Sequence, residues 1–176
     1  MAMVMHMTRA SLLSLAGILA LAYGLLAAGI QNAAADSITF KAMVIEVKDG
    51  DTLVVLRNKT RLTVKLPGID APELDQPFGP EAKRFAAKLV QGKVVTVEMF
   101  QPGNPIYGTV RLSKNRILAH EMVKAGMAWA MTSDKSSVFS EAQQAAKSAR
   151  LGLWVNSEEE EPIPPWEWRA QKRFGK

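Results

Sequence analysis

Between residues 38 and 73, short apolar runs alternate with turns, and this pattern limits the fold more than any other feature of the sequence. The runs 38–47 and 52–56 are rich in Val, Ile and Leu, and Lys48-Asp49-Gly50-Asp51 separates them. Asp-Gly between two apolar runs favours a β-hairpin. The next run, 61–66, is apolar at every second position, as in a strand with one buried face. The segment therefore predicts a three-stranded meander.

Four acidic residues follow the ends of these strands. Asp49 and Asp51 flank the glycine of the first turn, and Asp70 and Glu73 bracket an Ala-Pro step just after the third strand. Because the ends of neighbouring strands lie at one rim, we expect these carboxylates to converge on one hard cation, which binds several oxygen ligands. The pattern predicts the scaffold of a metal-dependent hydrolase.

The remaining sequence predicts two more strands and three helices. A helix is expected at 80–90, where a proline and an acid open a segment with apolar residues at helical spacing. Strands are expected at 94–100 and 106–112, and helices that glycines terminate at 116–125 and 140–150. This element order predicts an α+β fold, a five-stranded Greek-key β-barrel with three helices. Such barrels often bind nucleic acid on one face.

Residues 1–35 differ in composition from the rest of the chain. Residues 1–9 carry one arginine and no acid, residues 11–30 carry no charge, and three alanines follow at 33–35. This is the layout of a cleaved secretory signal peptide. An uncleaved membrane anchor is the alternative, since roughly 20 apolar residues also suffice to span a bilayer. We therefore expect an exported protein, secreted or periplasmic, or on the alternative a membrane-tethered one.

The chain after this leader is mildly basic and has no cysteine. Cleavage after residue 35 would leave 21 Lys and Arg against 17 Asp and Glu, a balance that suits a polyanionic substrate or simply solubility. The lack of cysteine excludes disulfides and thiolate metal sites, and two histidines make a zinc site or a His-centred triad improbable. We divide the chain into the leader (1–35), a barrel domain (36–156) and an acidic, Pro- and Trp-containing tail (157–176) that packs on or beside the domain.

Five motifs together resemble the thermonuclease (staphylococcal nuclease) family. They are Val-Lys-Asp-Gly-Asp-Thr at 47–52, Gly-Ile-Asp-Ala-Pro-Glu at 68–73, Phe-Gly-Pro-Glu-Ala at 78–82, Leu-Gly-Leu-Trp at 151–154 and Pro-Pro-Trp-Glu-Trp-Arg at 164–169. The resemblance extends over about Ile38 to Arg169. It implies an OB-fold barrel and a Ca²⁺-dependent nuclease that hydrolyses phosphodiester bonds of DNA and RNA. The implied partner is single-stranded or locally opened DNA or RNA, and no stable protein partner is expected.

The resemblance also implies roles for the acids. Asp51 and Asp70 would bind one Ca²⁺ through their carboxylates and Ala71 through its backbone carbonyl, with Asp49 supporting the cluster. Glu73 would orient or deprotonate the attacking water, a role usually worth about 10² to 10⁴ in rate. Calcium would polarise the phosphoryl oxygens and hold the nucleophile near them.

The sequence departs from the family pattern at both expected arginines. The first position, on the third strand, is Lys65, which is either a catalytic phosphate contact or a plain surface lysine. The second, after Tyr107-Gly108, is Thr109. Lysine is a point charge where arginine offers a planar fork, and losing one preorganised donor typically costs about 10² to 10³ in rate. Arg111 lies on the Thr109 face of an extended strand, and is either the catalytic substitute or a solvated residue. Tyr107 is a candidate to stack on a base or contact the phosphate.

Three readings of function follow from these features. The retained acids favour an enzyme, because four carboxylates repel a polyanion unless a cation is present. The missing arginines favour a catalytically weak or inactive barrel that binds nucleic acid or a protein. A membrane-tethered structural module is the third reading.

Overall fold

The computed structural model describes residues 38–131, 137–157 and 161–175. The predicted leader, residues 1–35, lies outside the described residues. Within the described ranges, no helix is both long enough and apolar enough to cross a membrane.

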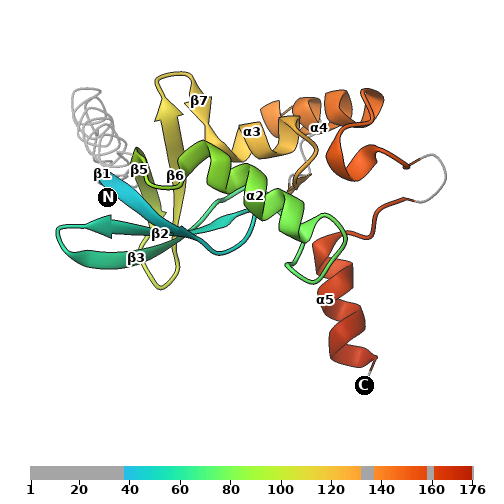
Figure 1. Cartoon of the computed structure of the whole chain (residues 1–176), viewed down its shortest axis with the longest axis horizontal. Helices are drawn as coiled ribbons and strands as arrows, with labels where there is room; N and C mark the ends of the chain where they lie inside the picture. The colour runs from blue at the N-terminus through green and yellow to red at the C-terminus, as the bar shows by residue number, and fades with distance from the viewer. Residues whose placement is uncertain (1–37, 132–136, 158–160, 176) are drawn as a thin grey trace, which may run out of the picture. The chain divides into compact units, whose positions relative to one another are not determined.

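Five strands close into a barrel (Figure 1). They are β1 (Ile38–Val47), β2 (Thr52–Arg57), β3 (Thr60–Lys65), β5 (Val94–Gln101) and β6 (Ile106–Ser113). Neighbours in the order β3-β2-β1-β5-β6 pair antiparallel, and a parallel pairing of β3 with β6 closes the ring. The predicted meander and five-stranded barrel are therefore confirmed. Over much of their length β1, β5 and β6 alternate more buried and less buried residues, because one face of a barrel wall points inward.

Three short strands complete the sheets. β7 (Arg116–Ile117) extends the barrel sheet beyond β6, and β4 (Ile69–Asp70) pairs with β8 (Trp129–Ala130) in a small separate sheet. Asp70 lies opposite Trp129 in this pairing. The β4–β8 pairing therefore holds the backbone that carries one of the predicted metal ligands.

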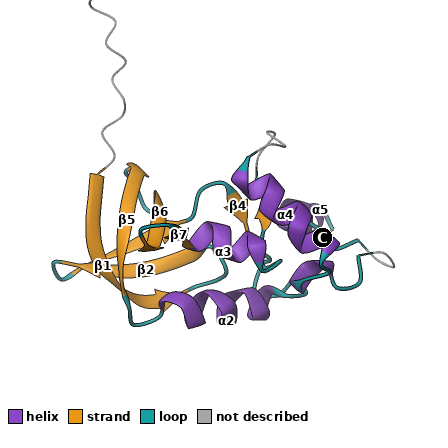
Figure 2. Cartoon of the chain, turned by 90° about the horizontal axis from the view of Figure 1, so that it is seen from above, coloured by secondary structure: helices purple, strands orange, loops and turns teal. Residues whose placement is uncertain are grey.

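Four α-helices lie within the described residues, one more than the sequence predicted. They are α2 (Gly79–Val90), α3 (Leu118–Lys124), α4 (Val138–Ser148) and α5 (Pro165–Phe174), and a 3-10 turn, η1 (Gly152–Trp154), follows α4. The first three correspond to the predicted helices. The extra helix is α5, in the segment assigned to the tail, which begins with Pro165 in its first turn. Figure 2 shows these helices beside the strands of the barrel.

The core has two parts. The larger fills the barrel and extends under α2 and α3, where buried residues such as Ala86 and Met122 join the inward-facing valines of the strands. The smaller centres on Trp129 and Trp154, whose rings meet edge to face with centroids 5.5 Å apart. Trp129 is only 6% exposed, so it belongs to the packing beneath the tail.

Candidate functional site

A groove of about 480 Å³ lies where the ends of β3, β4 and β6 meet the middle of α5. It is lined by Lys65, Leu66, Pro67, Gly68, Ile69, Asp70, Glu73, Tyr107, Met131 and Arg169. Five of these residues are polar or charged, and four of those five were singled out from the sequence. The exception is Arg169, which comes from the C-terminal helix.

Asp51 lies buried beside this groove, at the end of the first hairpin turn. Its Oδ2 accepts the backbone N–H of Ala71 at 3.0 Å, and its Oδ1 accepts the Thr52 hydroxyl at 3.0 Å. The turn fits against Ala71 because residue 50 is glycine: a Cβ there would lie 2.6 Å from the Cβ of Ala71. Asp49 supports the turn, since its Oδ1 accepts the backbone N–H of Asp51 at 3.0 Å. Asp49 therefore holds the turn that carries Asp51.

Lys65, the last residue of β3, provides the positive charge nearest to Asp51. Its Nζ lies 2.5 Å from Asp51 Oδ1. Burial raises the pKa of Asp51 to about 6, although the charge of Lys65 acts in the opposite direction. Partial burial acts to lower the pKa of Lys65, but the charge and hydrogen bond of Asp51, with the charges of Asp49 and Asp70, together raise it. This ammonium is therefore held over a carboxylate, with 30% of the side chain exposed to the groove.

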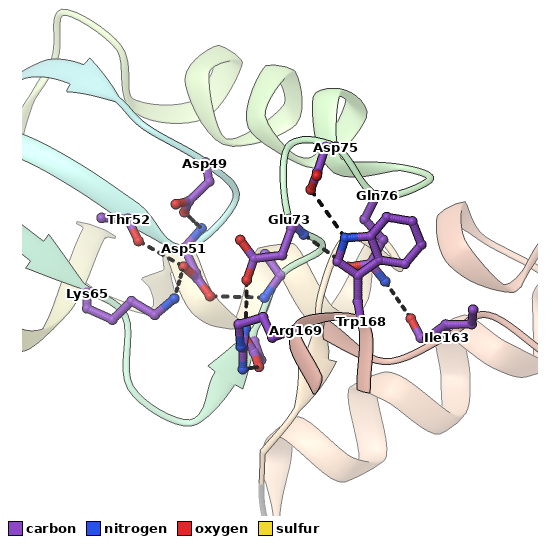
Figure 3. A network of polar contacts seen from close by, with 12 residues as sticks. Asp49, Asp51, Thr52, Lys65, Glu73, Asp75, Gln76, Ile163, Trp168 and Arg169 are labelled. Atoms are coloured by element: carbon purple, nitrogen blue, oxygen red, sulfur yellow. Dashed lines mark hydrogen bonds and ion pairs between the residues drawn. The ribbon is translucent and has the colours of Figure 1, made fainter. Parts of the chain in front are cut away.

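Asp70 and Glu73 share one partner, Arg169; Figure 3 labels Glu73 and Arg169 of this group. Arg169 Nη1 donates to Asp70 Oδ1 at 3.2 Å and Nη2 donates to Asp70 Oδ2 at 2.8 Å, which is the two-pronged geometry of a guanidinium on a carboxylate. Nη1 also donates to Glu73 Oε1 at 2.7 Å. These contacts raise the pKa of Arg169 above its ordinary value, chiefly through the hydrogen bonds to Asp70. Asp70 is buried, whereas 37% of the Glu73 side chain is exposed.

The loop that carries Glu73 is fastened to the tail at other points as well. Gln76 Oε1 accepts the backbone N–H of Glu73 at 3.1 Å, and Gln76 Nε2 donates to the carbonyl of Ile163 at 2.5 Å. Asp75 accepts the indole N–H of Trp168 at 3.2 Å and forms an ion pair with Lys172. Helix α5 is thereby placed against the loop by contacts that do not involve Arg169 (Figure 3).

The acids occupy one region but do not converge as the sequence analysis expected. Within the described ranges, no group of three or more His, Asp or Glu side chains is placed to hold a metal ion. Instead each carboxylate has a cationic or amide partner: Asp51 has Lys65, Asp70 and Glu73 have Arg169, and Asp49 has a backbone N–H. The donor set is still all oxygen and rich in carboxylates, which suits calcium or another hard cation. Lys65 and Arg169 show that the carboxylates of Asp51, Asp70 and Glu73 stabilise positive charge in this region.

The remaining predicted residues lie on β6, and the structure separates them. Tyr107 pairs with Lys65 across the parallel β3–β6 contact, is 40% exposed and lines the groove. Arg111 points to the same face but lies farther along β6, where its guanidinium donates to both oxygens of Glu98 at 2.5 and 3.0 Å. Arg111 is not among the residues that line the groove. The structure therefore groups Tyr107 with the acids and does not bring Arg111 to them.

Arg169 was missed as a site residue, although its motif was noticed. Pro-Pro-Trp-Glu-Trp-Arg is one of the motifs that carry the resemblance, and it lies in the segment that the sequence predicts to be a packed tail. An arginine one turn into a helix that begins Pro-Trp-Glu was the available indication. Nothing local in the sequence tells that its partners lie 99 and 96 residues earlier in the chain.

Comparisons with known proteins agree with this architecture. A family model described as staphylococcal nuclease homologue matches residues 63–156. An uncharacterized endonuclease of Escherichia coli is 35% identical over 132 residues, which are 73% of this chain and 84% of the relative. The probable staphylococcal-like nuclease CAN1 of Oryza sativa subsp. japonica is 38% identical over 125 residues, 69% of this chain and 36% of the relative. An uncharacterized 38.1 kDa protein of Capnoides sempervirens is 40% identical over 126 residues, 69% of this chain and 35% of the relative. This chain spans about a third of the last two proteins.

Proposed function

Because this chain belongs to the staphylococcal nuclease homologue family, we propose that it is a Ca²⁺-dependent nuclease that cleaves phosphodiester bonds in single-stranded or locally opened DNA or RNA. The observation that carries the proposal is the groove itself. Buried Asp70, half-buried Glu73 and the side chains of Lys65 and Tyr107 face one opening, with buried Asp51 bonded to Lys65 at its edge. The names of the relatives, endonuclease and staphylococcal-like nuclease, support the same reaction class.

Asp51 and Asp70, with the carbonyl of Ala71, are the residues that would hold the cation. When bound, calcium would supply Lewis-acid polarisation of a phosphoryl oxygen. The hairpin turn and the β4–β8 pairing fix the backbone of the two aspartates, and a bound cation would compete with Lys65 and Arg169 for their carboxylate oxygens. Burial of Asp51 disfavours its ionised form when no cation is bound, and this raises its pKa.

Glu73 would be the general base that takes a proton from the attacking water. Its carboxylate faces the groove, and its backbone is fixed through the hydrogen bond to Gln76. Lys65 would neutralise charge at the phosphate, and Tyr107 would stack on a base or contact the phosphate. A base and a cationic donor on the same groove are the minimum for in-line attack of water on a phosphodiester.

The proposed localisation, export from the cytoplasm, rests on the composition of residues 1–35. A signal peptide at residues 1–35 would deliver the protein to the periplasm or the medium, and an uncleaved leader would tether it to the membrane. Mass spectrometry of the protein from the cell envelope or medium tests this: a mature N-terminus near residue 36 supports export with cleavage, and an N-terminus at Met1 contradicts the cleavage.

The activity is tested with the full chain and heat-denatured DNA, in Ca²⁺ or in chelator. We expect cleavage in Ca²⁺, none in chelator, and a loss of about 10² to 10⁴ in rate for Glu73→Gln. Glu81→Gln, which removes an exposed acid from α2, is the matched control and should cleave as the unaltered protein does. Intact DNA at high protein concentration, with measurable binding, would favour the alternative, a binding module that keeps the barrel without the reaction.

A further inference from the structure

Among the described residues, no arginine from a barrel strand lines the groove. The cationic side chain that the barrel strands place in the groove is Lys65, and the residue that follows Tyr107-Gly108 is Thr109. Arg111 is held by Glu98 away from the groove. A lysine alone cannot present two parallel donors to a phosphate. If this groove receives a phosphodiester, its forked cation must come from another part of the chain.

Arg169 is the one arginine among the described residues that line the groove. It comes from α5, outside the range that the family model matches. Of its side chain, 45% is exposed. A guanidinium carries five N–H donors, and three are used, two by Asp70 and one by Glu73. The Nε–H and one N–H of Nη2 have no bonded partner among the described residues, and these adjacent donors form a fork.

The position of Arg169 is built into the fold. Trp168 and Lys172 bind Asp75, and Ile163 binds Gln76, so α5 is attached to the Glu73 loop on both sides of Arg169. Trp166 adds an edge-to-face contact with Trp129, with ring centroids 6.5 Å apart. Ten helical residues are marginal in isolation, so these contacts are what position the guanidinium over the two acids.

We propose that Arg169 binds the phosphate of the substrate, so that the C-terminal helix supplies the forked cation that the barrel lacks. Asp70 and Glu73 hold the guanidinium in place on one edge, and its remaining N–H groups meet a phosphodiester oxygen on the other. This inference rests on the proposed function, since it assigns a further substrate-binding residue to the same groove. The opposing account is that Arg169 is only a counterion, which neutralises the acids and keeps phosphate out.

Binding separates the two accounts without any need for turnover. The probe is a fluorescent single-stranded phosphorothioate oligonucleotide, titrated with the full chain in Ca²⁺ and followed by anisotropy over a range of salt concentrations. The variants are Arg169→Ala, Arg169→Lys and Arg173→Ala. Arg173 lies one turn farther along α5, is exposed and does not line the groove, so its substitution removes the same charge from the same helix.

We expect Arg169→Ala to bind about tenfold or more weakly, as for a lost charge-assisted fork, and Arg169→Lys to fall between it and the unaltered protein. Losing one phosphate contact should also lower the slope of log K against log salt by about 0.7 for a single strand. Arg173→Ala should bind within about twofold of the unaltered protein. Circular dichroism checks that α5 persists. If Arg169→Ala unfolds, Arg169→Lys decides, because it keeps the charge but not the planar fork: weaker binding than the unaltered protein supports the proposal, and equal binding overturns it.

Equal or tighter binding by a folded Arg169→Ala, or an equal loss in Arg173→Ala, would overturn the assignment to Arg169 and leave the nuclease proposal standing. If the unaltered protein does not bind the oligonucleotide in Ca²⁺, the proposed function fails, and the role of Arg169 fails with it.

Discussion

The Nζ of Lys65 and the Oδ1 of Asp51 lie 2.5 Å apart at the edge of the groove, one partly exposed and the other buried. This pair joins the end of β3 to the first hairpin turn. It stabilises the site while no cation is present, because a buried carboxylate needs a partner. Burial destabilises the ionised form of Asp51 more than Lys65 stabilises it, so the pKa of Asp51 is raised to about 6.

The raised pKa of Asp51 predicts a pH dependence of stability. The folded protein binds a proton at Asp51 more readily than the unfolded chain does, so the contribution of Asp51 to stability is fully present below pH 4 and is lost as the pH rises through 6. For a pKa raised from 3.8 to about 6, the full loss is on the order of 3 kcal/mol. Urea unfolding in chelator at pH 4 and pH 7 measures this loss. The reference is Asp51→Asn, whose side chain at residue 51 does not titrate.

The quantity to compare is the unfolding free energy of the unaltered protein minus that of Asp51→Asn. We expect this difference to be larger at pH 4 than at pH 7. A difference that stays constant or grows with pH would mean that Lys65 dominates and that Asp51 has an ordinary or lowered pKa.

Arg111 should be dispensable for cleavage. Its guanidinium is bound to Glu98 and lies outside the groove, so Arg111→Ala should leave kcat/KM within about twofold. Tyr107→Ala, a truncation on the same face of β6 but inside the groove, should raise KM about tenfold, as for the loss of one stacked base. A large loss of kcat in Arg111→Ala would show that Arg111 reaches the substrate.

Gly79 should be essential for the placement of Glu73. A Cβ on residue 79 would lie 1.8 Å from the backbone carbonyl oxygen of Glu73, so Gly79→Ala must push the Glu73 loop away from α2. We expect a loss of at least about 2 kcal/mol in unfolding free energy, together with a large fall in cleavage. Gly92→Ala is the comparison: a Cβ there meets nothing within 4 Å, and its positive φ of 72° alone should cost about 1 kcal/mol. Equal effects of the two substitutions would contradict the close contact.

The barrel could be predicted because its strands carry their own pattern. Alternation along 61–66, the Asp-Gly turn at 49–50 and the Pro-Glu opening of α2 are all local, and the structure follows them. Arg111 was placed on the correct face of β6 by the same alternation. Its pairing with Glu98 depends on the register between β5 and β6, in which Glu98 lies opposite Thr109, and no local pattern contains that register.

The tail shows the other limit of sequence reasoning. Helix α5 draws its stability from Asp75, Gln76 and Trp129, which are distant in sequence. The fork between Arg169 and Asp70 spans 99 residues. Prolines and tryptophans near an acidic run also fit a packed tail without a site role, so the residues alone do not place the guanidinium of Arg169 in the groove.

The central claim is that Asp51 and Asp70, from two separate strand ends, bind one divalent ion together. Calorimetric titration of the full chain with Ca²⁺ tests it most directly, with Asp51→Asn, Asp70→Asn and Glu81→Gln as variants. The account predicts one ion per chain, affinity reduced at least tenfold in each aspartate variant, and an unchanged titration in Glu81→Gln. Unaltered calcium affinity in Asp51→Asn and Asp70→Asn, or no calcium binding by the unaltered protein, would contradict it.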